Sequence, residues 1–327
     1  MNSVFIIILN YNGDKDTVAC IDSLLNITYS PITVCVIDNG SERDSVDALN
    51  RYFDEIRPRF ASFQTSQTAP IEKDKQNLIA VFNDDNLGFA AGNNVGARMA
   101  LQAGFEYVLL LNNDTLVEPD FLEKLMTFCV SHPHYVAVTP KICLESPRNI
   151  IWNCGGKLTW FKNRKYYYPS SDVRKTPHTG FSDVSIITGC ALLFKPKETG
   201  LLTEDFFFGE EDFEFSLRMK RQKKKMACVY DAVIYHKVGS TVNKTYPNTT
   251  GKLKLFYINR FIDIKNYYPK TWRLWVFINS TYAFFMIRLR YKVTLKRNLK
   301  LWFDVYREVK TKTDVSKEYF MHYMKTK

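Results

Sequence analysis

Acidic and amide side chains follow four short apolar runs of the sequence, and together they could bind a polar ligand. The runs are residues 4–9 followed by Asn10, residues 32–37 followed by Asp38, residues 78–82 followed by residues 83–85, and residues 107–111 followed by residues 112–114. Short runs rich in Val and Ile are typical of buried parallel strands. Ligands of an open α/β sheet bind just beyond the carboxyl ends of its strands. Four polar endings in register therefore predict a site for a ligand that carries phosphates or a metal ion.

A second set of candidate residues follows the aromatic run Phe206-Phe207-Phe208. Glu210, Glu211 and Asp212 come next and open a predicted helix. Acids are common in a first helical turn, because the helix N-terminus favours negative charge. An ionised Asp212 at the mouth of a site could also take a proton from an attacking hydroxyl. The three adjacent acids repel one another, and a nearby cation would relieve that repulsion.

Two residues could hold that cation. Asp114 follows a predicted strand, and one carboxylate there can bind Mg²⁺ together with substrate phosphates. The alternative is that Asp114 caps the next helix or turn. His236 ends an apolar stretch, and its neutral imidazole could be a further metal ligand. The alternative for His236 is a structural hydrogen bond.

Two turns could approach a nucleotide closely. Gly88, Gly92 and Gly96 lead into a predicted helix whose N-terminus could attract phosphate. Their spacing matches neither the dinucleotide-binding fingerprint nor a P-loop, which disfavours a nicotinamide dehydrogenase or a P-loop kinase. In the turn Asp38-Asn39-Gly40-Ser41, Asp38 could accept hydrogen bonds from a nucleobase or ribose, although this sequence is also a common generic turn.

The elements that position these residues alternate along the first 141 residues. Helices are predicted at 16–26, 42–56, 92–103 and 119–131, and another strand begins at 135–139. Such alternation predicts an α/β fold with a parallel sheet and right-handed crossovers. Residues 57–76 are predicted to be a long loop, and residues 150–185 are predicted to be rich in loops.

Charge is concentrated near the C-terminus of this chain of 327 residues and net charge +11. From residue 271 onward there are 13 Lys and Arg against 4 Asp and Glu, an excess of nine positive charges. The aromatic segment 272–292 lies between cations, which suits a helix on an anionic membrane surface. The alternative is a helix that packs on the protein with a solvated basic face. No nucleic-acid-binding motif accompanies the charge, so we expect no nucleic-acid partner.

The remaining composition indicates a reducing compartment. The seven cysteines form no C-x-x-C pair and are predicted to be buried thiols. The N-terminal segment lacks the features of a secretory signal, and no run of about 20 uncharged apolar residues predicts a spanning helix. We expect a cytoplasmic protein, with peripheral contact at the cytoplasmic face of the membrane if the basic tail binds lipid.

Taken in order over about residues 4–260, the motifs resemble the family-2 inverting glycosyltransferases, and most of all a bacterial rhamnosyltransferase-like subgroup. The matching motifs are Asn10-Tyr11-Asn12, Asp38-Asn39-Gly40-Ser41, Asn86-Leu87-Gly88-Phe89 with Gly92-Asn93-Asn94, Leu111-Asn112-Asn113-Asp114, Thr188-Gly189-Cys190, Glu211-Asp212 with Arg218, and His236 with Gly239-Ser240. Two positions depart from the family pattern. Asn112 stands where the D-x-D motif has its first acid, and the later Arg-Asn pair is Asn259-Arg260 here.

The resemblance implies a GT-A fold, which is a Rossmann-like, mostly parallel sheet flanked by helices, here with a C-terminal helical extension. Residues 1–141 would bind the nucleotide sugar, residues 142–260 would form the acceptor and catalytic half, and residues 261–327 would form the basic extension. A nucleotide-diphosphate sugar and Mg²⁺ or Mn²⁺ are implied as donor and cofactor. By position, the implied roles are as follows: Asp212 is the catalytic base; Asp114 and His236 bind metal; Asn10, Tyr11, Asp38, Asn86, Gly88, Asn93 and Asn113 bind the donor; Trp152, Gly189, Cys190 and Glu211 lie on the acceptor side.

The predicted function is therefore inverting transfer of a sugar, with rhamnose as one candidate, to a hydroxyl of a glycan or lipid-linked glycan in polysaccharide biosynthesis at the cell envelope. A sugar-nucleotidyltransferase is one alternative, but it requires a cationic glycine-rich loop where this chain has Asn10-Tyr11-Asn12-Gly13-Asp14. A non-catalytic protein that binds sugar nucleotides is the other alternative.

Overall fold

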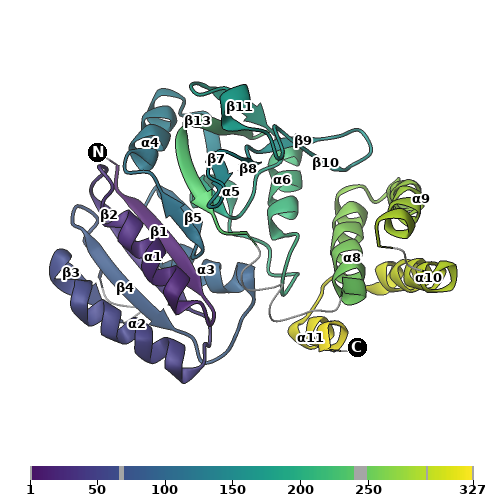
Figure 1. Cartoon of the computed structure of the whole chain (residues 1–327), viewed down its shortest axis with the longest axis horizontal. Coiled ribbons are helices and arrows are strands. Elements are labelled where there is room, and N and C mark those ends of the chain that lie inside the picture. The colour runs from purple at the N-terminus through teal and green to yellow at the C-terminus, as the bar shows by residue number, and fades with distance from the viewer. Residues whose placement is uncertain (1, 66–69, 239–248, 292–293, 326–327) are drawn as a thin grey trace.

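A central sheet carries the predicted strands (Figure 1), and the computed structural model describes residues 2–65, 70–238, 249–291 and 294–325. In one half of the sheet, β1 (Val4–Asn10) lies in parallel between β2 (Ile32–Asp38) and β5 (Tyr107–Asn112). Beyond β2 come β4 (Asn77–Phe82) and then β3 (Ser62–Gln64), also in parallel. Because the strands are parallel, the polar residues that follow them meet at one edge of the sheet.

The other half of the sheet is mixed. β12 (Ala191–Phe194) pairs in antiparallel fashion with β5 on one side and with β7 (Tyr135–Leu144) on the other. β13 (Lys225–His236) runs parallel to β7, and β11 (Phe181–Val184) pairs antiparallel with β13. The short strands off this order are β6 (Thr115–Val117), β8 (Ile151–Asn153) and the hairpin of β9 (Gly156–Leu158) with β10 (Arg164–Tyr166). The predicted mostly parallel α/β fold is thus confirmed.

Alternate residues of β1 face opposite layers of helices. Ile6 and Ile8 lie in one core with residues of α1 (Asp14–Leu24), α2 (Arg43–Ile56) and α4 (Phe121–Ser131). Phe5 and Ile7 lie in the other core, with residues of α3 (Phe89–Gln102) and α6 (Glu211–Arg221). The short helix α5 (Pro196–Thr199) precedes α6. Because both faces are covered, the strands read as continuous apolar runs rather than as alternating patterns.

Two predicted loop regions contain short regular elements. The stretch 57–76 was predicted to be a loop, but it contains the 3₁₀ turn Arg57–Arg59 and the edge strand β3. Residues 150–185 contain β8, β9, β10, the 3₁₀ turn Val173–Lys175 and β11. Strands of three or four residues are too short to show a period in the sequence, and neighbouring strands determine where they form.

The C-terminal part is helical and has a core of its own. It comprises α8 (Thr249–Tyr267), α9 (Trp272–Tyr291), α10 (Leu295–Thr311) and α11 (Lys317–Lys325), which lie beside the sheet domain in Figure 1. Phe261, Trp275, Val305 and Phe320 belong to its buried cluster. None of the helices in the described residues is both long enough and apolar enough to span a bilayer. The three-part division stays a prediction, and its boundary at 141 falls within β7 while that at 260 falls within α8.

Candidate active site

A cavity of about 370 Å³ opens at the carboxyl edge of the parallel strands. Asp114 and Asp212, which are far apart in the sequence, both line it, as do Phe207, Phe208 and Phe320. Most other residues predicted from the sequence also line the cavity, namely Tyr11, Asn86, Gly88, Asn113, Trp152, Gly189, Cys190, Glu211 and His236. Asn10, Asp38 and Asn93 are outside this lining. The structure therefore brings most of the predicted site together in one cavity.

Asn10 and Asp38 form a buried network next to Tyr11 and Asn39, which line the cavity. They are register partners at the ends of β1 and β2, and Asn10 Nδ2 donates to Asp38 Oδ2 at 2.7 Å. The backbone N–H of Ser41 donates to Asp38 Oδ1 at 2.9 Å, and the hydroxyl of Thr17 donates to Asn10 Oδ1 at 2.8 Å. These bonds hold the turns after the two strands, from which Tyr11 reaches the cavity. Donor contacts by Asn10 and Asp38 stay predictions.

Asn39 organises the turn that holds Asn86 and Gly88. Its Nδ2 donates to Asn86 Oδ1 at 3.0 Å and to the Gly88 carbonyl at 3.1 Å. Gly88 has φ +89°, and a Cβ there would come within 2.2 Å of the Phe207 carbonyl oxygen, so only glycine fits this close approach. Asn93 is buried in α3, where its Nδ2 donates to the Phe89 carbonyl at 2.9 Å.

Asp114 and His236 form a pair on the cavity wall. His236 is the last residue of β13 and is the register partner of Thr115 in β6, which places its ring beside the turn that carries Asp114. Its Nε2 lies 3.1 Å from Asp114 Oδ1, and its buried Nδ1 has no hydrogen-bond partner in the described part of the chain. The Trp152 ring packs edge-on against the imidazole at 4.4 Å. Asp114 thus presents a carboxylate oxygen, and His236 an imidazole nitrogen, that could coordinate a metal ion in the cavity. Gly239 and Ser240, which complete the predicted motif, are outside the described residues.

Two arginines pair with Glu210 and Asp212 at the start of α6. Arg164 Nη2 donates to Asp212 Oδ1 at 2.7 Å and lies 3.2 Å from Glu210 Oε1. Arg260 donates to the buried Glu210 through Nε and, at 3.2 Å, through Nη2. Arg260 therefore pairs with an acid and does not line the cavity, where a phosphate would bind. Glu211 is also buried, and its Oε2 has no hydrogen-bond partner among the residues described.

The pKa values of the three carboxyl groups differ because their surroundings differ. Burial raises the pKa of Asp212, while Arg164 and the Gly189 backbone N–H act in the opposite direction. Burial and the neighbouring Asp212 raise the pKa of Glu211 to about 8. Burial also acts to raise the pKa of Glu210, but Arg164 and Arg260 hold that pKa below its usual value. At neutral pH the turn thus presents a protonated Glu211 beside Asp212, whose carboxylate pairs with Arg164.

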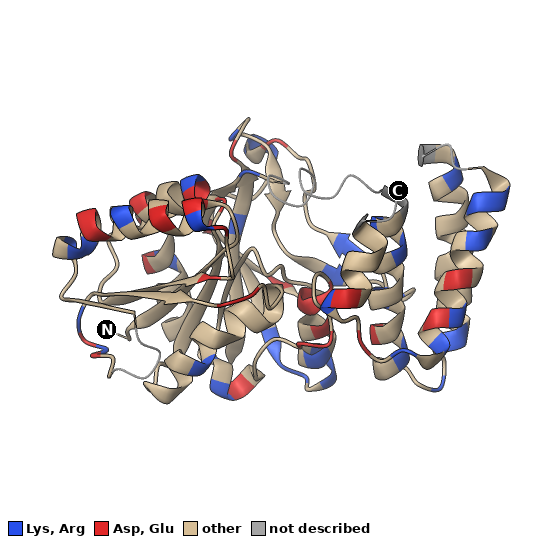
Figure 2. Ribbon diagram, turned by 90° about the horizontal axis from the view of Figure 1, so that it is seen from below, with Lys and Arg blue, Asp and Glu red and all other residues tan. Residues whose placement is uncertain are grey.

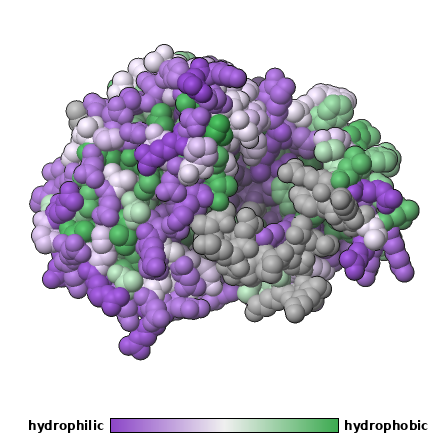
Figure 3. Space-filling model, viewed as in Figure 1, coloured by the Kyte–Doolittle hydropathy of each residue, from purple (hydrophilic) through white to green (hydrophobic). Residues whose placement is uncertain are grey.

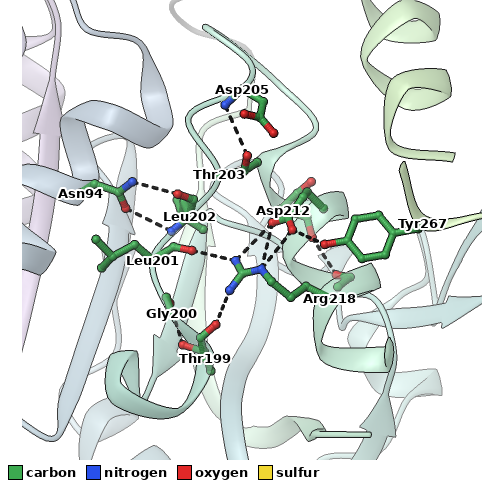
Figure 4. Close-up of polar contacts among 12 residues, drawn as sticks. Asn94, Thr199, Gly200, Leu201, Leu202, Thr203, Asp205, Asp212, Arg218 and Tyr267 are labelled. Atoms are coloured by element: carbon green, nitrogen blue, oxygen red, sulfur yellow. Dashed lines mark hydrogen bonds and ion pairs between the residues drawn. The ribbon is translucent and has the colours of Figure 1, made fainter. Parts of the chain in front are cut away.

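Arg218 holds α6 against the loop that precedes it (Figure 4). Its guanidinium donates to the carbonyls of Thr199 and Leu201, and its Nε donates to Glu214 at 3.0 Å. The Arg218 in the predicted motif is thus structural, and it fixes the helix whose first turn presents Asp212. Asn94 secures the same loop through paired hydrogen bonds with the Leu202 backbone.

Two contributors to the site carried no signal in the sequence. Arg164 lies on β10, within a stretch predicted to be loop-rich, and nothing near it in the sequence links it to Asp212. Phe320 lies on α11, and this helix reaches the cavity because the backbone of Val315 bonds to Asp205 and Phe207. Both contacts join segments that are distant in the chain.

Comparison with known proteins identifies the family. The model of the family described as "Glycosyl transferase family 2" matches residues 5–195, more than half of the chain. The chain belongs to glycosyl transferase family 2. The matched residues of this family 2 glycosyl transferase include Asp114 and Cys190 but end before Asp212 and His236.

Individual relatives are more distant. Chondroitin synthase from Escherichia coli is 30% identical to this family 2 glycosyl transferase over 121 residues, which are 37% of the chain and 14% of that protein. The structure of S. aureus TarS 1–349 superposes with a TM-score of 0.55 at 15% identity, over 94% of this chain and 80% of that one. GalNAc-T7 with UDP, GalNAc and Mn²⁺ superposes with a TM-score of 0.58 at 14% identity, over 98% of this chain and 56% of that one. These two superpositions support the GT-A type of fold.

Proposed function

We propose that this chain transfers a sugar from a nucleotide-diphosphate donor to a hydroxyl of a glycan acceptor, with inversion at the anomeric carbon. The observation that carries the proposal is one cavity at the carboxyl edge of the sheet that contains both the Asp114–His236 pair and Asp212. Family membership makes glycosyl transfer the reaction class to expect. The rhamnosyltransferase-like subgroup and its sugar stay a prediction.

A divalent cation, Mg²⁺ or Mn²⁺, fits the Asp114–His236 pair. The carboxylate and the imidazole converge on the cavity wall, and both are donors that such ions accept. The described residues contain no group of three or more His, Cys, Asp or Glu that could hold a metal ion, so donor phosphates and water would supply the other ligands. A bound cation would neutralise charge on the leaving nucleotide diphosphate.

Asp212 is the proposed general base. As the acceptor oxygen attacks the anomeric carbon, the bond from that carbon to the donor phosphate oxygen breaks, and Asp212 takes the hydroxyl proton. Arg164 positions this carboxylate, since it donates to Oδ1, and its charge opposes the rise in the pKa of Asp212 that burial causes. Glu211, protonated at neutral pH, can donate a hydrogen bond to the acceptor.

The walls of the cavity suit a sugar acceptor. Trp152, Phe207 and Phe208 present aromatic surface next to the polar groups, and sugar rings bind such surfaces through their apolar faces. A lipid-linked glycan stays a predicted acceptor. All seven cysteines are buried free thiols, which supports a location on the cytoplasmic side.

Thermal unfolding with a panel of nucleotide sugars tests the proposal. We expect one nucleotide-diphosphate sugar, added with Mn²⁺ at 100 times its Kd, to stabilise the chain by about 2.7 kcal/mol, because it binds only the folded state. The same sugar with EDTA is the control and should stabilise much less. Release of free sugar from that donor would separate an enzyme from a non-catalytic binding protein. If no nucleotide sugar stabilises the chain in the presence of Mn²⁺, the proposed donor site is wrong.

The role of Arg164 predicts a change in pH dependence. Arg164→Gln removes the positive charge that lowers the pKa of Asp212, so that pKa rises and the base is protonated at pH values where the native enzyme is active. The acid limb of the kcat/KM profile should therefore move to higher pH. A hydrogen bond to a charged group contributes about 1.5–3 kcal/mol, so activity below the optimum should fall on the order of tenfold or more. Arg164→Lys keeps the charge and is the matched control. If the acid limb of the kcat/KM profile stays at the native pH in Arg164→Gln, then Arg164 does not act through Asp212.

A further inference from the structure

The outer face of the C-terminal helices carries apolar side chains that the fold does not bury. On α9, Leu274, Phe277, Phe285 and Leu289 recur at spacings of three, eight and four residues, which places them along one side of the helix. Phe277 is 70% exposed and Leu289 is 76% exposed, and Phe303 on α10 is 69% exposed. Trp275, Val276 and Ile287 occupy the inner side of α9 and pack in the C-terminal core. Figure 3 shows hydrophobic atoms gathered where α9 lies.

A loop of the sheet domain extends this face. Trp160 and Phe161 lie at the tip of the β9–β10 hairpin and are 70% and 49% exposed. The Trp160 ring packs edge-on against Trp275 of α9 at 5.0 Å, and the Phe161 carbonyl accepts a hydrogen bond from Asn279 of α9 at 3.0 Å. The aromatic tip and α9 are therefore held together in the folded chain. This hairpin also carries Arg164, which contacts Asp212.

Positive charge surrounds these apolar side chains. α9 contains no acidic residue, and α10 contains only Asp304 and Glu308, which both lie near Arg307 in ion pairs. Figure 2 shows Lys and Arg along these outermost helices. The exposed cations of the two helices are Arg273, Arg288, Lys296, Arg297, Lys300, Arg307 and Lys310. Apolar and aromatic side chains bordered by Lys and Arg match the interface of an anionic bilayer, with headgroups near the cations and acyl chains near the rings.

We propose that the face formed by α9, α10 and residues 159–163 docks on an anionic lipid surface. A second copy of the chain fits this face poorly, because two such faces would bring like charges together. Since no described helix can cross a bilayer, the contact would be peripheral, with the side chains inserted at headgroup level. Docking would bring the β9–β10 hairpin, whose Arg164 contacts Asp212, next to the lipid, where a lipid-linked acceptor would be presented. Only this last consequence depends on the proposed function.

Vesicle co-sedimentation of the full chain, without donor or acceptor, tests the surface. We expect binding to vesicles of phosphatidylcholine with phosphatidylglycerol, little binding to phosphatidylcholine alone, and weaker binding at high salt because salt screens the charges. The triple variant Phe277→Ser, Phe285→Ser and Leu289→Ser should bind about 100-fold more weakly or worse, because three apolar side chains no longer insert. Lys296→Gln and Lys300→Gln should each weaken binding by about fivefold.

Matched controls separate lipid contact from other effects. Val130 is 65% exposed on α4, a helix that lies apart from the C-terminal helices (Figure 1), so Val130→Ser should bind like the native chain. The triple variant should unfold at the native temperature, since its side chains are exposed. The proposal is overturned if anionic vesicles do not bind the chain, or if the triple variant binds them as well as the native chain does. A native dimer in light scattering that the triple variant dissociates would also overturn it, because the face would then serve self-association.

Discussion

Asp212→Asn is expected to lower sugar transfer by about 10²–10⁴-fold while donor binding survives. Asparagine has nearly the same shape and can still accept a hydrogen bond from Arg164, but it cannot take the proton of the acceptor hydroxyl. Transfer of a radiolabelled sugar measures the loss, and calorimetry measures the affinity for the donor nucleotide. Retention of the donor affinity would show that the cavity is intact in the variant.

The control for this experiment is Asp183→Asn. Asp183 is a carboxylate on β11 that accepts a hydrogen bond from the Tyr135 hydroxyl and is outside the cavity lining. Its replacement removes a negative charge and weakens a structural hydrogen bond without touching the site, so transfer should persist. Native turnover in Asp212→Asn would mean that another group is the base.

Asp114→Ala is expected to weaken Mn²⁺-dependent nucleotide binding by at least about 100-fold. Loss of an outer-shell partner typically costs 10- to 100-fold in metal affinity or activity, and loss of a direct ligand should cost at least as much. The variant would leave His236 as the remaining member of the pair. Calorimetry with a nucleoside diphosphate, in Mn²⁺ and in EDTA, measures the effect, and the native and variant chains should bind similarly weakly in EDTA.

Asp16→Asn is the matched control for Asp114. The carboxylate of Asp16 pairs with Lys237, the residue next to His236, at 2.6 Å but is not part of the cavity lining. Its removal changes the nearby charge and leaves the two proposed ligands in place. Equal losses in both variants would point to a general charge effect. A native metal-dependent affinity in Asp114→Ala would remove that residue from the site.

Much of the nucleotide-side architecture could be predicted from local patterns. The apolar runs of β1, β2, β4 and β5 form buried parallel strands, because continuous apolar sequence is stable only where helices cover both faces of a sheet. Parallel pairing then requires the residues that follow these strands to meet at one edge. This is why Tyr11, Asn86 and Asp114 line one cavity, as the ordered motifs predicted.

The mixed half of the sheet could not be predicted in this way. β12 lies between β5 and β7, although it comes after both in the sequence, and the chain reaches it only after the β8–β11 segments. An apolar run of four residues is compatible with several neighbours in either direction, so its partner depends on how the whole chain packs. The pairing of β3, at the opposite edge of the sheet, could not be predicted for the same reason.

The sequence by itself determined the α/β class, the polar edge of the sheet and the ordered motifs that mark family 2, because burial and turn formation are encoded by residues close together. Only the tertiary structure decided that Arg164 contacts Asp212, that Phe320 reaches the cavity and that α9 packs one side while exposing the other. Each of these depends on contacts between distant segments. Such contacts form when the sheet domain and the C-terminal helices each bury their apolar surfaces, and no local pattern specifies which distant side chains then meet.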